Sequence, residues 1–352
     1  MNLNAMENDI LSDDMNGDVK QVNKEIRDDS GCLHAFRSFF LLTNQKEEKS
    51  HNGYILLLHG VCSSALHFLT ALKGLEGEEI HALELPGFGR SQMETMHPEM
   101  EGIEVIESVC KHIEVYLGIR NENENQNESE IDQKKKRDIT IIGHSLGAFF
   151  AVHFAKRNPE MVERLILVDP IGILSDLSPL AERLTILFKV YFTRSQLLFC
   201  KWMGMENILH ALTSKEKQVV YHYYLRLLFS EDAFGHFFLK RFFDVRLTGC
   251  RWNMPCLEDL CDFASRKSKS VHLMYGGEDT LTPHAQGSLI LGEIEEKNKN
   301  KNKNKNKERG VSLSLDIIPG GGHTPIVDKT EYFCEIVKRR SRKECNLSMS
   351  IV

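Results

Sequence analysis

Short apolar runs, each closed by glycine or proline, recur along this chain and constrain its fold more than any other feature. Each run is four to seven residues long and rich in Leu, Ile or Val, and helix-like stretches such as Leu146–Arg157 and Asp328–Arg340 separate them. Runs of this kind are typical of strands buried on both faces of a parallel sheet. The sequence therefore predicts an α/β fold with a mostly parallel, doubly wound sheet. The predicted strands are Tyr54–Leu58, Glu79–Leu85, Ile139–Ile142, Leu165–Val168, Val271–Tyr275 and Leu313–Ile318.

Two tracts of low complexity interrupt this pattern. One is rich in Asn, Gln, Glu and Lys, and the other alternates Lys and Asn, so neither can bury enough apolar surface to offset the entropy of ordering. Each follows a predicted helix and precedes a predicted strand, which places it at the sheet edge opposite the carboxyl ends of the strands. The segments expected to be disordered are 1–30, 119–137 and 295–310, and residues 343–352 form a tail.

Residues 171–265 break the alternation of strands and helices. They show no clear strand signal, yet they hold both tryptophans and more than half of the aromatic residues. We expect a helical lid inserted between two strands of a core made of residues 31–170 and 266–342. An ordinary helical subdomain is the alternative. Four phenylalanines share one face of a predicted helix, namely Phe234, Phe237, Phe238 and Phe242.

The motif that carries chemistry is Gly-His-Ser-Leu-Gly at 143–147. It follows the predicted strand Ile139–Ile142 and precedes a predicted helix, which is the context of the Gly-x-Ser-x-Gly nucleophile elbow. Ser145 has to adopt a strained backbone conformation in a sharp turn, and the flanking glycines have no Cβ to collide across it. The start of the following helix favours developing negative charge. The sequence therefore predicts that Ser145 is a nucleophile.

A serine nucleophile needs a base and an acid to orient the base. His323 follows the last predicted strand in a glycine-rich loop, and Asp279 follows the strand before it. The chain order Ser145, Asp279, His323 is the order found in α/β hydrolases. We expect these three residues to form a catalytic triad. Glu278 and Asp169 also lie next to strand ends and remain rival acids.

Acyl transfer also needs donors for an oxyanion. One expected donor is the N–H of Leu146, the residue after the nucleophile, and the second is the N–H of Val61 in the loop after the first predicted strand. His59 and Gly60 begin the same loop, and we expect them to line the substrate site.

Two features of the predicted lid suggest the substrate. Its aromatic residues are suited to lining an apolar channel for a long acyl chain. Its basic residues gather against one acid, Asp244, and we expect them to meet a phosphate headgroup or an anionic bilayer, a solvated basic face being the alternative. These residues are Lys240, Arg241, Arg246 and Arg251.

Composition excludes several classes. The formal net charge of −6 gives no electrostatic footprint for binding nucleic acid. The nine cysteines form no C-x-x-C pair, so we expect reduced thiols in a cytoplasmic protein rather than a disulfide scaffold or a zinc ribbon. No signal-peptide pattern and no uncharged apolar run of about 18 residues is visible, so we expect no spanning helix. The predicted chemistry requires no metal or organic cofactor.

Together these motifs resemble the α/β-hydrolase superfamily from about residue 33 to 342. The resemblance is carried by His-Gly at 59–60, LPGFGRS at 85–91, GHSLG at 143–147 and LILVDP at 165–170. MYGGED at 274–279 and GGGHTPIVD at 320–328 are similar to one branch of it. That branch contains lysophospholipases, N-acylphosphatidylethanolamine lipases, lysophosphatidic-acid acyltransferases and a lipid-droplet lipase co-activator.

The resemblance implies a serine hydrolase that cleaves lipid esters (lysophospholipid, N-acylphospholipid or acylglycerol) through an acyl-enzyme. We expect it to act in the cytoplasm or on the surface of a membrane or lipid droplet. A lysophosphatidic-acid acyltransferase and a non-catalytic lipase co-activator are the alternatives. The co-activator members have Asn in place of the nucleophile, whereas this chain keeps Ser145. The branch is also marked by His-x4-Asp, here His323 and Asp328, although Asp328 and Glu331 fit a helix cap as well.

Overall fold

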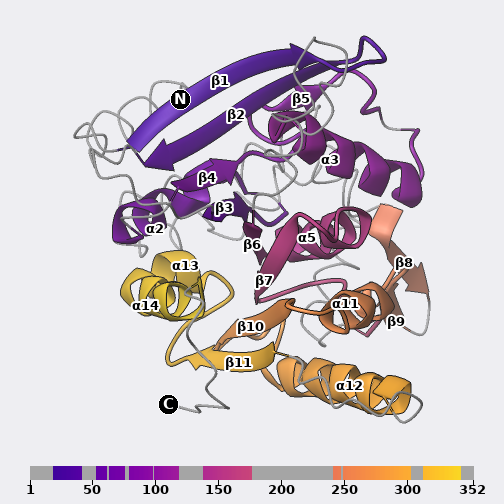
Figure 1. Ribbon diagram of the computed structural model, residues 1–352, viewed down its shortest axis with the longest axis vertical. Helices are drawn as coiled ribbons and strands as arrows, with labels where there is room; N and C mark the ends of the chain where they lie inside the picture. The colour runs from indigo at the N-terminus through magenta and orange to yellow at the C-terminus, as the bar shows by residue number, and fades with distance from the viewer. Residues whose placement is uncertain are drawn as a thin grey trace, which may run out of the picture.

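A single nine-stranded sheet organises the computed structural model (Figure 1). Its strands lie in the order β1-β2-β4-β3-β6-β7-β10-β11, and β5 (Gln92–Met93) pairs with β2 beside this path. The structure describes residues 19–41, 53–61, 63–75, 79–97, 99–118, 138–176, 241–246, 249–302 and 312–341.

The six strands from β4 to β11 are parallel to their neighbours. The register pairs Leu58 with Gly143, and His144 with Val168, so the carboxyl ends of the central strands meet at one edge. All six were predicted from their apolar runs, and the predicted fold class is confirmed. Their bounds are β3 (Gly53–Leu58), β4 (Glu79–Leu83), β6 (Asp138–His144), β7 (Val162–Val168), β10 (Ser270–Gly276) and β11 (Ser312–Ile318).

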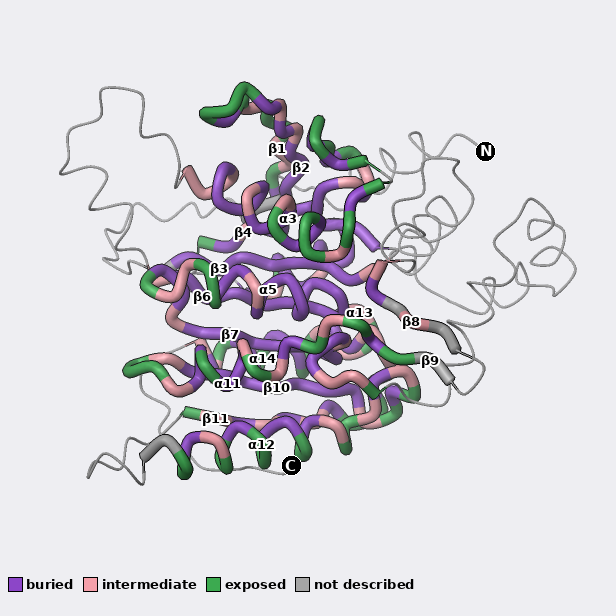
Figure 2. The backbone as a smooth tube through the Cα atoms, turned by 90° about the vertical axis from the view of Figure 1, so that its right-hand side faces the viewer, coloured by how far each residue is buried: buried purple, intermediate pink, exposed green. Residues whose placement is uncertain are grey.

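Helices cover both faces of this sheet (Figure 1), and the central strands between them are buried, drawn purple in Figure 2. Alternate residues of β3 point to opposite faces: Leu56 and Leu58 belong to one apolar cluster, Ile55 and Leu57 to the other. The first cluster is completed by α3 (Gly102–Tyr116), α5 (Leu146–Arg157), α11 (Leu257–Ala264) and α12 (Ala285–Asn302). The second is completed by η1 (Ala65–Phe68), α2 (Leu69–Gly74), α13 (Pro325–Asp328) and α14 (Thr330–Ser341).

An antiparallel pair, β1 (Val19–Arg27) and β2 (Leu33–Leu41), extends one edge of the sheet. The prediction of disorder over residues 1–30 is therefore wrong for residues 19–30, whereas residues 1–18 lie outside the described part. β2 also pairs with β4. The residues of β1 show only a weak pattern of apolar side chains, and the strand forms because its pairing with β2 stabilises it.

The second low-complexity tract begins inside a helix. α12 continues to Asn302, so the predicted disorder of 295–310 is wrong for 295–302. Ile290 and Ile294 are buried in the preceding turns and anchor the helix against the sheet. A helix that has already formed can extend by a few residues without a new nucleation step. Residues 303–311 and 119–137 lie outside the described residues. Their flanking strands β11 and β6 begin at the edge opposite Ser145.

The region predicted as a helical lid contains a hairpin, β8 (Phe243–Arg246) with β9 (Gly249–Trp252). The expectation of no strand in this region is therefore wrong. Its last part, α11, packs against α5 and α12 as one of the helices that cover the sheet. Residues 177–240, with three of the four phenylalanines predicted to share a helix face, lie outside the described part. In the ranges that the structure describes, every helix is too short or too polar to cross a membrane.

Candidate active site

Ser145 lies at the turn between β6 and α5, at the carboxyl edge of the sheet. Its φ of 53° and ψ of −115° place it in the positive-φ half of backbone space. Residues other than glycine adopt such conformations at a cost of about 1–3 kcal/mol. The helix can begin this close to β3 because residue 147 is glycine: a Cβ there would lie 2.1 Å from the carbonyl oxygen of Leu58. The strained turn predicted from the sequence is thus present.

The three predicted triad residues form one chain of hydrogen bonds. The Ser145 hydroxyl lies 3.1 Å from Nε2 of His323, and Nδ1 of His323 lies 2.8 Å from Oδ2 of Asp279. Nδ1–H donates to the carboxylate, which leaves Nε2 as the acceptor for the serine proton. All three follow the carboxyl ends of strands, β6, β11 and β10 respectively.

The Asp279 carboxylate is held as an anion by several donors. Its Oδ1 accepts from the N–H groups of Leu281 (2.7 Å) and Thr282 (3.2 Å), and its Oδ2 accepts from the Thr282 hydroxyl at 2.5 Å. Burial alone would raise the pKa of Asp279, but the hydrogen bonds from His323 and Thr282 outweigh it, and the pKa is lowered. Asp279 is therefore suited to stabilise an imidazolium at His323.

The two rival acids occupy different positions. Glu278 is exposed, and its backbone N–H donates to Gly321. Asp169 is fully buried at the end of β7, where Oδ1 accepts from the N–H of Gly276 at 2.9 Å. The carboxylate that accepts the hydrogen bond from His323 is that of Asp279.

The predicted oxyanion residues border the nucleophile. Leu146 directly follows Ser145 as the first residue of α5. On the other side, a Cβ at Gly60 would lie 3.0 Å from the Cβ of Ser145, so the loop that carries Val61 passes against the serine. The donor roles of the Val61 and Leu146 N–H groups stay predictions.

His59, in contrast, bonds to backbone groups through both ring nitrogens, and its expected place in the substrate site stays a prediction. The ring is fully buried, Nδ1–H donates to the Gly60 carbonyl at 2.8 Å, and Nε2 accepts from the N–H of Leu85 at 3.0 Å. Burial lowers the pKa of His59 to about 4, so the ring is neutral at pH 7. His59 joins the loop after β3 to the loop after β4.

Two further residues of the site were not found from the sequence. Thr282 bonds the triad acid, and its signal was a hydroxyl residue three positions after Asp279. His144 was visible inside the elbow motif. Its Nε2–H donates to the backbone carbonyl of His323 at 2.7 Å, and its ring stacks on His67, with centroids 4.8 Å apart.

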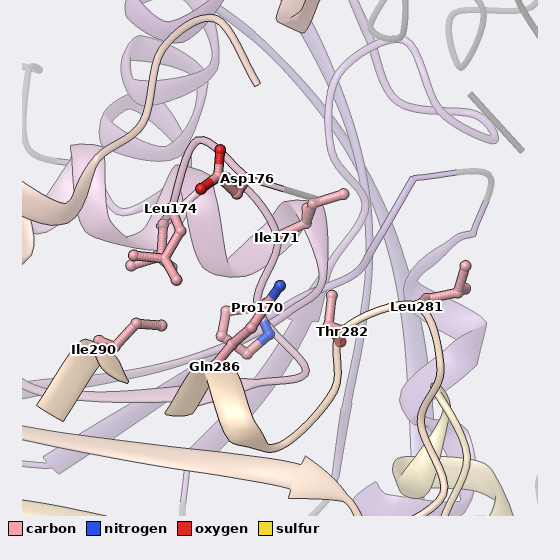
Figure 3. Close-up of a pocket in the computed structure, with 10 residues that line it drawn as sticks. Pro170, Ile171, Leu174, Asp176, Leu281, Thr282, Gln286 and Ile290 are labelled. Carbon is pink, nitrogen blue, oxygen red and sulfur yellow. The ribbon is translucent and has the colours of Figure 1, made fainter. Parts of the chain in front are cut away.

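A pocket opens beside the triad, between the segment after β7 and the segment from Leu281 into α12 (Figure 3). Two bonds connect its walls to the site: the N–H of Ile171 donates to the Ser145 carbonyl at 3.3 Å, and Thr282 bonds Asp279. The lining is mainly aliphatic, with one amide, one carboxylate and one hydroxyl. The lining residues are Pro170, Ile171, Gly172, Ile173, Leu174, Asp176, Leu281, Thr282, Gln286 and Ile290.

The basic residues predicted to meet a headgroup lie apart from one another. Nε of Arg241 donates to the Met100 carbonyl at 2.5 Å. Arg251 lies 3.7 Å from Asp176 at the pocket, and both side chains are largely exposed. Lys240 and the side chain of Arg246 lie outside the described part. A headgroup role stays a prediction, which Arg251 fits better than Arg241.

Asp328 does not begin the long C-terminal helix. The predicted helix from Asp328 to Arg340 is divided: α13 ends at Asp328, and α14 starts at Thr330. Oδ2 of Asp328 instead accepts from the Thr324 hydroxyl at 3.1 Å, in the turn directly after His323. The capping box predicted with Glu331 is therefore wrong.

Two clusters of described residues carry metal-ligand atoms within 4.8 Å of one another. In the cluster of His144, Asp169 and His323, both ring nitrogens of His323 already engage the triad. In the cluster of Asp28, Cys32 and His34, the Lys111 ammonium contacts the Asp28 carboxylate, where a cation would bind. Neither arrangement favours a metal.

Comparison with known proteins yields three relatives, two of which are named for an activity on lipids. The chain is 31% identical over 135 residues to "Abhydrolase domain-containing protein abhd-5.2" of Caenorhabditis elegans, covering 37% of this chain and 26% of that protein. It is 21% identical to "1-acylglycerol-3-phosphate O-acyltransferase ICT1" of Saccharomyces cerevisiae, covering 42% of this chain and 48% of that protein. It is 29% identical to the "(Lyso)-N-acylphosphatidylethanolamine lipase" of Mus musculus, covering 34% of this chain and 30% of that protein. These matches span about a quarter to a half of each relative.

The fold has close counterparts among solved structures. A membrane phospholipase A described as a bacterial virulence factor superposes with a TM-score of 0.57 at 16% identity, covering 96% of this chain and 90% of that one. The family model described as "Alpha/beta hydrolase family" matches residues 55–336. The relatives confirm the branch that the motifs resemble. This chain therefore belongs to the alpha/beta hydrolase family.

Proposed function

We propose that this protein is a serine hydrolase that cleaves carboxylic esters of lipids through an acyl-enzyme. The observation that carries the proposal is the continuous hydrogen-bond chain from Ser145 through His323 to Asp279, with the serine on a strained turn at a helix start.

The geometry suits two-step acyl transfer. His323 Nε2 takes the proton of Ser145 as its oxygen attacks the ester carbonyl, and Asp279 stabilises the imidazolium. The N–H groups of Val61 and Leu146 are proposed to hold the oxyanion, and loss of one such donor typically costs about 3–4 kcal/mol. His323 then returns its proton to the leaving alcohol, and water, deprotonated by His323, cleaves the acyl-enzyme.

A lipid substrate is supported by the pocket beside the triad and by the names of the relatives. The aliphatic walls formed by Ile171, Leu174 and Ile290 favour an acyl chain, since each buried CH₂ contributes about 0.8 kcal/mol. Within this class, a lysophospholipid, an N-acylphospholipid and an acylglycerol all present the required ester. We propose that the protein acts in the cytoplasm, at the surface of a membrane or lipid droplet. The five cysteines whose side chains the structure describes are thiols, which is consistent with a reducing compartment.

Transfer to a lysophosphatidic-acid hydroxyl is the second candidate. It uses the same acyl-enzyme with a lipid hydroxyl in place of water, and one relative is named as an acyltransferase for acylglycerol phosphate. A non-catalytic co-activator is less well supported, because this chain has the serine, histidine and aspartate in bonding contact.

The test is labelling with a fluorophosphonate probe, followed by turnover of a lipid ester panel by wild type and by Ser145→Ala. We expect the wild type to be labelled and active, and Ser145→Ala to lose both while its thermal melting is unchanged. A folded wild type that takes no probe and cleaves no ester would support the co-activator instead. Adding a lysophosphatidic-acid acceptor distinguishes transfer, which yields a diacyl product, from hydrolysis, which yields free fatty acid.

A further inference from the structure

Asp169 is a buried carboxyl group beside the triad that the proposed mechanism does not use. Its side chain is fully buried, directly after β7. Oδ1 accepts from the N–H of Gly276, while Oδ2 has no hydrogen-bond partner among the residues that the structure describes. A purely structural link to Gly276 needs only Oδ1. That structural role gives no reason for a second buried oxygen, Oδ2, without a hydrogen-bond partner among the described residues.

The position of Asp169 corresponds to that of the triad acid on the neighbouring strand. β7 and β10 are adjacent and parallel, with Val168 paired to Met274. Asp169 follows the end of β7 as Asp279 follows the end of β10. One oxygen of Asp169 lies within 4.8 Å of a ring nitrogen of His323 and of His144. Two carboxyl groups thus approach the same catalytic imidazole from neighbouring strand ends.

We propose that Asp169 is a second acid for His323, uncharged while Asp279 is a carboxylate and able to ionise and support the imidazolium when Asp279 is removed. Two carboxylates in one buried site cannot both ionise readily, because their like charges repel each other strongly away from bulk water. The proton therefore stays on the carboxyl group that accepts fewer hydrogen bonds. Asp279 accepts three hydrogen bonds from Leu281 and Thr282 as well as the one from His323, whereas Asp169 accepts one.

The electrostatic environment agrees with this assignment. Burial and the Asp279 carboxylate raise the pKa of Asp169 well above its usual value, while the pKa of Asp279 is lowered. Removing the charge of Asp279 removes one cause of the raised pKa of Asp169. The acid can then release its proton to solvent and leave a carboxylate within reach of His323. The titratable groups that face Asp169 are Asp279, His144, His323, Tyr275 and Asp328.

The inference rests on the proposed function, and a double-mutant cycle tests it separately. The variants are Asp279→Asn, Asp169→Asn and the double variant, each isosteric and each keeping a side-chain acceptor, with Ser145→Ala as the blank. We expect kcat on a short-chain ester to fall less than tenfold in Asp169→Asn and about 10²-fold in Asp279→Asn. The double variant should fall to about 10⁻⁴ of wild type, the loss typical of a triad without its acid.

A second readout separates an ionising acid from a structural one. The ratio of kcat in Asp279→Asn to kcat in the double variant should fall as the pH is lowered, because only Asp169 distinguishes the two. Thermal melting controls for folding, and Asp169→Ser replaces Asp169→Asn if the latter does not fold.

The failures are distinguishable. An inactive, unlabelled wild type rejects the proposed function. An active wild type in which Asp279→Asn and the double variant have equal kcat, or a ratio constant with pH, rejects only the role of Asp169.

Discussion

The ring of His144 donates a 2.7 Å hydrogen bond from Nε2–H to the backbone carbonyl of His323. His144 is the last residue of β6 and precedes Ser145, whereas His323 lies in the loop after β11. This bond joins the turn of the nucleophile to the loop of the base. It is independent of the contact between the Ser145 hydroxyl and the His323 ring, so it can fix the imidazole even when the serine is acylated.

His144→Phe is expected to lower kcat about tenfold with little change in KM. Phenylalanine keeps the stack on His67 but donates no hydrogen bond to the loop of the base, and an imidazole displaced by a fraction of an ångström transfers protons less efficiently. Steady-state kinetics on a short-chain ester measures the effect. The control is His67→Phe, which keeps the stack and leaves the bond to His323 in place. Equal kcat values in the two variants at equal folded fraction would contradict the role of His144.

Leu174→Trp is expected to shift the substrate profile toward short acyl chains. Leu174 lines the pocket from the segment after β7 and is only partly buried, so an indole there occupies space that a chain would fill (Figure 3). In the wild type, kcat/KM should rise with acyl length until the pocket is full, whereas the variant should cleave acetyl esters normally and lose most turnover of long-chain esters. The exposed Leu289 offers a matched control, Leu289→Trp. A flat or falling wild-type profile from acetyl to palmitoyl, measured below the critical micelle concentration, would exclude the lipid assignment.

Deleting Asn121–Lys136 is expected to leave kcat nearly unchanged. The tract joins α3 to the start of β6, seven residues before Ser145 and at the opposite edge of the sheet. Kinetics and thermal melting of the deletion variant provide the measurement. A loss of activity in a variant that melts like wild type would show that the tract reaches the active site.

His67→Phe is expected to reduce the fall in the free energy of unfolding that the protein shows in mild acid. The ring of His67 is buried without a hydrogen-bond partner among the described residues, and burial lowers its pKa to about 3. Between that value and about 6.5, only the unfolded chain binds the proton, so stability is present above pH 6.5 and is lost as the pH falls. At pH 5 the loss amounts to about 2 kcal/mol.

Urea unfolding at pH 7 and pH 5 measures this difference. The variant should lose about 2 kcal/mol less than the wild type between the two pH values. His97→Gln, at an exposed histidine, is the comparison variant. If His67→Phe shows the same pH dependence as the wild type, the ring is protonated in the folded protein.

The sequence alone determined the central strands, the elbow at Ser145 and the choice of His323 and Asp279. These depend on local signals: an apolar run ended by glycine predicts a strand end, and parallel strands bring their carboxyl ends to one edge. The hairpin of β1 and β2, the helical beginning of the Lys/Asn tract and the hairpin within the predicted lid were missed. Their own residues carry weak patterns, and their stability comes from neighbours that the sequence does not identify.

Only the tertiary structure decided what the side chains around the triad do. The sequence could not show that His59 bonds Leu85, that His144 holds the loop of a residue 179 positions away, or that Asp169 faces the imidazole that Asp279 already bonds. Each of these facts depends on which strands are neighbours and on the register between them. The lateral order of strands follows from packing across the whole sheet, whereas the residues of any one strand record only how deeply that strand is buried.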